Sequence, residues 1–159
     1  MTATPRYRVL VVDDNRDAAD TAAVLFDLAG FDVRTCYDGP AALTEVDTFT
    51  PDACVLDISM PGMDGYELAR RLRERFAARP PVLATLTAFS HDAHLEDAVS
   101  AGFDLHFTKP ATSAEVIEQL RDALADTPPT PDPSPAATGR ESVLASLLHR
   151  LKGLFTPTR

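Results

Sequence analysis

Carboxylates follow two apolar stretches of the chain, and their placement points to metal and phosphoryl chemistry. Asp13 and Asp14 come directly after residues 9–12, and Asp57 closes a second apolar run, residues 53–56. If both runs are parallel strands, their carboxyl ends meet at one edge of a sheet, where open α/β folds bind ligands. Three carboxylates crowded there would repel one another, and a bound cation relieves that repulsion. A hard divalent ion with oxygen ligands, Mg²⁺, suits such a cluster.

A hydroxyl and an ammonium group follow two further apolar stretches. Thr87 comes after residues 82–86, and Lys109 comes after residues 103–108. A carboxylate can attack phosphorus and form an aspartyl phosphate, so Asp57 is the predicted phosphoacceptor. Mg²⁺ would contact one phosphoryl oxygen, Lys109 would pair with a second, and the Thr87 hydroxyl would donate to the third. The sequence therefore predicts a phosphoryl-transfer site.

Strand-like and helix-like segments alternate through residues 6–125, which we expect to form one domain. Apolar, β-branched stretches predict strands, and apolar residues at helical spacing predict helices. The expected strands are residues 8–12, 31–35, 53–57, 82–86 and 103–107, and the expected helices are residues 15–29, 38–46, 66–77, 92–101 and 113–125. This alternation predicts an α/β fold, a doubly wound five-stranded parallel sheet with helices on both faces. It does not fix the order of the strands.

Charge and composition argue against several classes of function. The 159-residue chain has a net charge of −9, and its acidic excess lies before residue 127. An acidic domain argues against direct nucleic-acid binding, which needs a basic face. No apolar run approaches the roughly 20 residues of a membrane span, and the first residues lack the apolar segment of a secretory signal. We therefore expect a cytoplasmic protein, in which Cys36 and Cys54 are small buried apolar side chains.

The end of the sequence predicts a linker and a short helix. Residues 126–139 are rich in proline, which favours an extended polyproline II linker. Residues 140–155 place their valine, leucine and phenylalanine side chains on one helical face, which predicts a C-terminal amphipathic helix. Three roles stay open for this helix, namely docking on its own domain, pairing with another chain in a homodimer, and contact with an anionic membrane.

Taken together, these motifs resemble the receiver domain of two-component response regulators over about residues 6–125. The resemblance lies in the pair Asp13-Asp14, in Asp57 with the loop Ile-Ser-Met-Pro-Gly-Met-Asp-Gly, in Leu-Thr87-Ala and in Phe-Thr-Lys109-Pro. All of these motifs occur in the family's order and spacing. The resemblance implies a flavodoxin-like fold with strand order 2-1-3-4-5.

The same resemblance implies one further metal ligand and a switch residue. The backbone carbonyl of Ser59 would join the three carboxylates in holding Mg²⁺. His106 stands where the family usually has a tyrosine or phenylalanine that rotates between inward and outward positions. A histidine can rotate in the same way, and it can also carry charge near neutral pH.

We therefore expect a stand-alone receiver that accepts a phosphoryl group on Asp57 from a histidine kinase or a phosphotransfer protein. Movement of Thr87 and Lys109 toward that group would bias a two-state surface that contacts an unidentified output protein. The chain would catalyse only its own phosphorylation and dephosphorylation. The residues after position 126 are too few for a helix-turn-helix domain, so no DNA-binding output is expected.

Two other functions stay open at this point. A phosphate-independent adaptor or scaffold acting through the tail helix is one, because His106 replaces the usual aromatic residue. The other is an aspartate-nucleophile phosphatase, which would need Asp-x-Asp after the first strand and a cap domain for its substrate. This chain has Asp13-Asp14-Asn15 there instead. Loss of phosphoryl labelling in Asp57→Ala would identify the receiver, and turnover of small phosphate esters would identify the enzyme.

Overall fold

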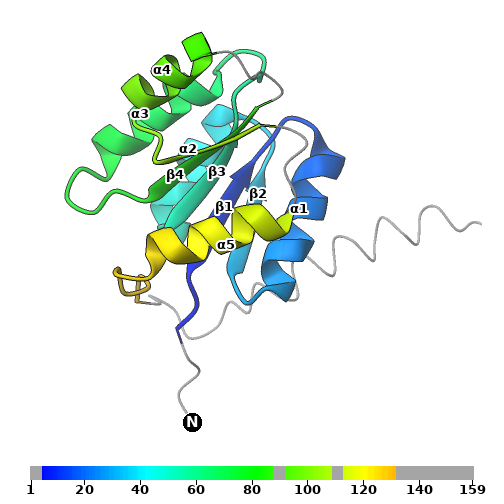
Figure 1. The fold of residues 1–159 in the computed structure, drawn as a ribbon, viewed down its shortest axis with the longest axis vertical. Coiled ribbons are helices and arrows are strands. Elements are labelled where there is room, and N and C mark those ends of the chain that lie inside the picture. Colours follow the sequence, from blue (N-terminus) through cyan, green and yellow to red (C-terminus); the bar gives the residue numbers. More distant parts are fainter. Residues whose placement is uncertain (1–4, 88–91, 109–112, 132–159) are drawn as a thin grey trace, which may run out of the picture.

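The computed structural model describes residues 5–87, 92–108 and 113–131, which form one parallel sheet covered by helices on both faces (Figure 1). The strand order is β2-β1-β3-β4-β5. The strands are β1 (Arg8–Val12), β2 (Asp32–Cys36), β3 (Ala53–Asp57), β4 (Val82–Thr87) and β5 (Leu105–Thr108). The helices are α1 (Arg16–Leu28), α2 (Gly39–Phe49), α3 (Gly65–Arg75), α4 (Asp92–Ala101) and α5 (Ser113–Leu124). The expected α/β fold and the strand order implied by the resemblance are both confirmed.

Short polar side chains fix where three of the helices begin. In each case a side-chain oxygen of the capping residue accepts a hydrogen bond from a backbone N–H in the first turn, which is otherwise unsatisfied. The caps are Asn15 with Ala18 N at 3.1 Å for α1, Asp38 with Ala41 N at 2.7 Å for α2, and Asp64 with Glu67 N at 2.8 Å for α3. The α1 cap, Asn15, directly follows the Asp13-Asp14 pair that comes after β1.

Each face of the sheet carries its own apolar layer. On β1, Leu10 and Val12 pack in a layer with residues of α2, α3 and α4, whereas Val9 and Val11 pack in a layer with α1 and α5. A parallel strand that is covered on both faces reads as a continuous apolar run, which is why these strands are visible in the sequence. Cys36 and Cys54 are both buried and both remain free thiols, as expected.

The last strand begins later than its apolar pattern predicts. Gly102 has a positive φ of 94° and ends α4, and Phe103 N donates to Ala98 O at 3.0 Å, so Phe103 belongs to the end of the helix. Asp104 then turns the chain, with its carboxylate accepting from Leu83 N at 2.9 Å. The regular pairing of β5 with β4 therefore begins at Leu105, in register with Ala84.

Residues 127–131 lie against the end of the sheet opposite the strand tips that carry Asp13 and Asp57. Thr130 donates to Asp52 Oδ1 from its N–H at 2.9 Å and from its hydroxyl at 2.6 Å. Asp52 directly precedes β3, and its carboxylate also accepts from Arg8 N at 2.8 Å. The first part of the predicted linker is thus held by the domain, whereas residues 132–139 and the predicted tail helix, residues 140–155, lie outside the described residues. Within the described part of the chain, no helix is long and apolar enough to cross a membrane.

Candidate metal and phosphoryl site

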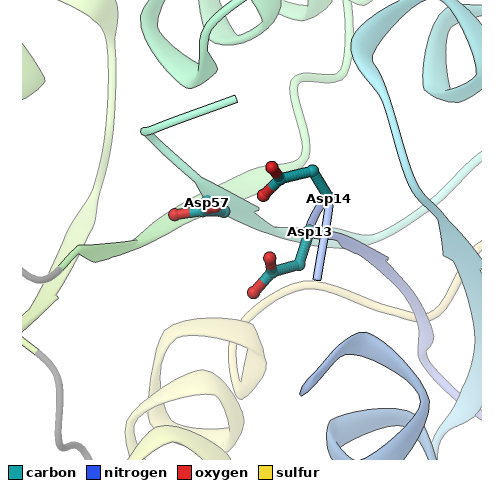
Figure 2. Close-up of side chains that lie close together, drawn as sticks. All are labelled: Asp13, Asp14 and Asp57. Carbon is teal, nitrogen blue, oxygen red and sulfur yellow. The ribbon is translucent and has the colours of Figure 1, made fainter. Parts of the chain in front are cut away.

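Three carboxylates meet at the carboxyl ends of β1 and β3 (Figure 2). Asp13 and Asp14 directly follow β1, Asp57 ends β3, and these two strands are neighbours in the sheet. Ligand oxygens of the three side chains all lie within 4.8 Å of one another. Asp13 and Asp57 are buried, with 5% and 8% of their surface exposed, whereas Asp14 is exposed. The predicted convergence of these residues is therefore present in the fold.

Backbone hydrogen bonds hold Asp13 at its place beside the sheet. Its N–H donates to Cys36 O of β2 at 3.2 Å. Its carboxylate accepts from Asn15 N at 2.9 Å, the two-residue pattern by which aspartate stabilises a turn. The same Asn15 then caps α1. The turn that starts α1 therefore also orients the Asp13 side chain.

The backbone at Asp57 is covered by the start of α3, at Gly65. Gly65 N donates to Ile58 O at 3.0 Å. A Cβ atom at position 65 would lie 2.9 Å from Ile58 Cα and would also clash with the carbonyl oxygen of Asp57. Only glycine allows this close approach. Gly65 was not among the predicted site residues, although the Asp-Gly pair that ends the loop was a usable signal.

Ser59 and Thr87 lie at the same edge of the sheet as the carboxylates. Ser59 is exposed and stands two residues beyond Asp57, in the loop that leaves β3. Thr87 ends β4, is 2% exposed, and follows Leu86, which is in register with Asp57 on the neighbouring strand. The structure therefore places the Thr87 residue at the strand tip beside Asp57, the predicted phosphoacceptor.

His106 and Lys109 complete the set of predicted site residues. His106 is half-buried on β5 and lies in register with Thr85 on β4. Lys109 lies outside the described residues, directly after Thr108, which is the last residue of β5. The role of Lys109 therefore stays a prediction from the sequence.

The donor set at this edge fits a hard divalent cation. All the donors are oxygen atoms, two of the three carboxylates are buried, and their separation is short enough for one ion to contact several of them. Mg²⁺ prefers such oxygen ligands and keeps several of its waters, and the exposed Asp14 leaves one side of the cluster open to solvent. The cluster could therefore hold Mg²⁺.

The sequence matches that of a known protein family over most of its length. Residues 9–121 match the response regulator receiver domain. The chain is 35% identical over 118 residues to the sensory transduction protein RegX3 of Mycobacterium tuberculosis, an alignment that covers 73% of this chain and 50% of that protein. It is 34% identical over 125 residues to the response regulator MprA of Mycobacterium avium, covering 79% of this chain and 54% of MprA.

Solved structures agree with the sequence matches. The receiver domain of the Francisella response regulator 1452 superposes with a TM-score of 0.70 at 28% identity, covering 77% of this chain and 99% of that one. A putative response regulator from Chloroflexus aurantiacus also gives 0.70 at 28% identity, covering 76% and 98%. The chain spans about half the length of the curated relatives it matches. Phosphorylation and Mg²⁺ binding are typical of these domains, and the chain belongs to the receiver domain family of two-component response regulators.

Proposed function

We propose that this receiver accepts a phosphoryl group on Asp57 and binds Mg²⁺ through Asp13, Asp14, Asp57 and the backbone carbonyl of Ser59. The observation that supports the proposal is the convergence of the three carboxylates, whose ligand oxygens lie within 4.8 Å of one another at one sheet edge. Two of these carboxylates are buried, and buried like charges are costly unless a partner charge compensates them. Bound Mg²⁺ would neutralise part of the charge and hold a phosphoryl oxygen.

The proposed reaction is a direct transfer from a phosphohistidine to Asp57. A carboxylate oxygen of Asp57 forms a bond to phosphorus while the bond between phosphorus and the donor imidazole nitrogen breaks. The electron pair stays on that nitrogen, and because the other ring nitrogen of the phosphohistidine carries a proton, the donor leaves as a neutral imidazole. The Thr87 hydroxyl donates to one phosphoryl oxygen and the Lys109 ammonium pairs with another, which stabilises the charge on the transferred group.

Signalling then follows from a difference in how two states of the domain contact the phosphoryl group. A ligand shifts a two-state equilibrium only as far as its affinities for the two states differ. Thr87 and Lys109 supply that difference, and His106 on the neighbouring strand β5 changes position with them. The proposed donor is a histidine kinase or phosphotransfer protein, and the proposed readout is contact with an output protein. The expectation of a stand-alone receiver without a DNA-binding domain stays a prediction.

Labelling with a small phosphodonor tests this function. The wild-type chain is incubated with radiolabelled acetyl phosphate, with Mg²⁺ or with EDTA, and the incorporated label is counted. We expect Mg²⁺-dependent label in the wild type and none in Asp57→Asn. Asp122→Asn is a matched control, because Asp122 is an exposed carboxylate on α5, and it should label like the wild type. Equal labelling of Asp57→Asn and the wild type would contradict the proposal.

A further inference from the structure

Two buried polar atoms have no hydrogen-bond partner within the described part of the chain, and they belong to Thr85 and His106. The unpaired atoms are the hydroxyl oxygen of Thr85 and Nδ1 of the His106 imidazole. Thr85 is fully buried, with 0% of its surface exposed. Buried polar groups are paired in the great majority of cases, and an unpaired one costs free energy. Two such atoms in one domain therefore need an explanation.

These two residues are direct neighbours across the β4–β5 pair. Thr85 lies in register with His106, and neighbouring strands of a sheet lie about 4.8 Å apart. Side chains that are directly opposite in a parallel pair point to the same face of the sheet. A threonine hydroxyl and an imidazole on such positions are within reach of each other when the imidazole takes a suitable rotamer.

The packing of the flanking residues shows which face this is. On β4, Leu83 packs in the layer that contains Ala98 of α4, whereas Ala84 packs in the layer of α1 and α5. On β5, Phe107 packs in the layer of α1 and α5. Because side chains alternate along a strand, Thr85 and His106 both face the α4 side. Thr87, two residues from Thr85, faces the same side.

The two unpaired groups are chemically complementary. A neutral imidazole carries one nitrogen that accepts a hydrogen bond, and a threonine hydroxyl can donate one. We propose that Thr85 is the positioning residue for His106, and that its hydroxyl donates to His106 Nδ1 in a second rotamer of the imidazole. In the present structure neither atom has a partner among the described residues, and in the second state each satisfies the other.

This inference rests on the proposed function, because it deepens the role given there to His106. Phosphorylation would favour the paired state, since Thr87 lies on the same face of the same strand as Thr85 and is the residue expected to move toward the phosphoryl group. An apolar ring at position 106 has no nitrogen that could accept a hydrogen bond from the Thr85 hydroxyl. The proposed contact therefore needs both the threonine and the histidine. The pair gives the ring two positions that differ by one hydrogen bond.

Nitrogen NMR of the imidazole tests the contact directly. NMR spectra of the ¹⁵N-labelled chain are recorded at about pH 8, where an ordinary histidine is neutral. They are recorded with and without Mg²⁺ and beryllofluoride, which mimics a phosphoryl group. His106→Phe identifies the signals of His106. We expect loading to move the Nδ1 resonance toward the hydrogen-bonded value in the wild type and in Thr85→Ser, which keeps the hydroxyl. Thr85→Val keeps the shape without the hydroxyl and should show no such movement.

Affinity for beryllofluoride gives a second readout. One net hydrogen bond gained only in the loaded state corresponds to about a twofold to tenfold weaker apparent affinity in Thr85→Val. In the His106→Phe background the same substitution should have no effect, because the partner is absent. Movement of Nδ1 in Thr85→Val equal to that in the wild type, or additive effects of the two substitutions, would overturn the inference. A wild-type chain that takes up no beryllofluoride would overturn the proposed function as well as the link between loading and pairing.

Discussion

Replacing Asp13 by asparagine should stabilise the metal-free protein and abolish its stabilisation by Mg²⁺. The ligand oxygens of Asp13, Asp14 and Asp57 lie within 4.8 Å of one another. Two unit charges at that separation repel by about 3.5 kcal/mol at an effective dielectric constant of about 20. Asp14 is exposed, so solvent screens most of its share. We expect removal of the Asp13 charge to raise the free energy of unfolding by about 1–3 kcal/mol without metal.

The substitution is well matched because asparagine keeps the shape and the acceptor oxygen of the side chain. That oxygen accepts from Asn15 N at 2.9 Å, so the turn into α1 is preserved and charge is the main change. Urea unfolding is measured in EDTA and in Mg²⁺. With Mg²⁺ at about ten times its Kd, the wild type should gain about 1.4 kcal/mol by mass action, and Asp13→Asn should gain almost nothing.

Asp122→Asn is the control, since Asp122 is an exposed carboxylate on α5. It should leave both the metal-free stability and the Mg²⁺ gain close to the wild type. Two results would refute the electrostatic reasoning. One is lower stability of Asp13→Asn than of the wild type in EDTA. The other is a Mg²⁺ gain in Asp13→Asn as large as in the wild type.

Three further predictions concern the packing and hydrogen bonding of the domain. Asp52→Ala should lower the free energy of unfolding by about 2–4 kcal/mol, because it leaves the backbone and hydroxyl donors of Thr130 and Arg8 N without their acceptor; urea titration measures this. Gly65→Ala should cost about 1–3 kcal/mol and slow labelling by acetyl phosphate, because the added methyl group collides with the backbone at Asp57. Burial raises the pKa of both thiols, that of Cys36 to about 12, so native thiols should resist iodoacetamide at about pH 8. Above the ordinary thiol pKa of 9.0 the unfolded chain loses protons that the folded chain keeps, so stability should fall as the pH rises from there toward 12.

Each of these predictions has a matched control or a contrary result. Thr130→Val removes only the hydroxyl donor to Asp52, so it should cost about 1 kcal/mol, less than Asp52→Ala; equal costs would show that Asp52 does not join several donors. Gly62→Ala changes the same loop where a Cβ meets nothing within 4 Å, although its φ of 81° adds backbone strain, so labelling should slow less than in Gly65→Ala. Fast labelling of Cys36 in the native state would contradict its assignment to the core.

The tips of β1, β3 and β4 were predictable from the sequence because each of these strands is a largely buried, mostly apolar run that ends at or just before a polar residue. Asp13, Asp57 and Thr87 could be assigned in this way, and their convergence follows from parallel strands ending at one edge. The strand order was not predictable from periodicity, since each apolar run is equally suited to any place in the sheet. It came from the resemblance to receiver domains.

The contacts that were not predictable from the sequence depend on strand register and on packing between distant segments. Thr85 becomes a neighbour of His106 only when β4 and β5 pair in one particular register. Thr130 reaches Asp52 only because α5 returns the chain to the start of the sheet. The start of β5 was placed too early because Phe103 is apolar, although its N–H completes the end of α4. Hydrophobic pattern carries no information on any of these partners.

Chemical mapping of the phosphorylated residue tests the central claim most directly. The chain is phosphorylated with acetyl phosphate in Mg²⁺, reduced with borohydride, which converts an aspartyl phosphate to homoserine, and sequenced by mass spectrometry. We predict homoserine at position 57 and at no other aspartate, with none formed in EDTA. Homoserine at another aspartate such as Asp13, or the same yield at position 57 without Mg²⁺, would contradict the assignment of Asp57 as a metal-dependent phosphoacceptor.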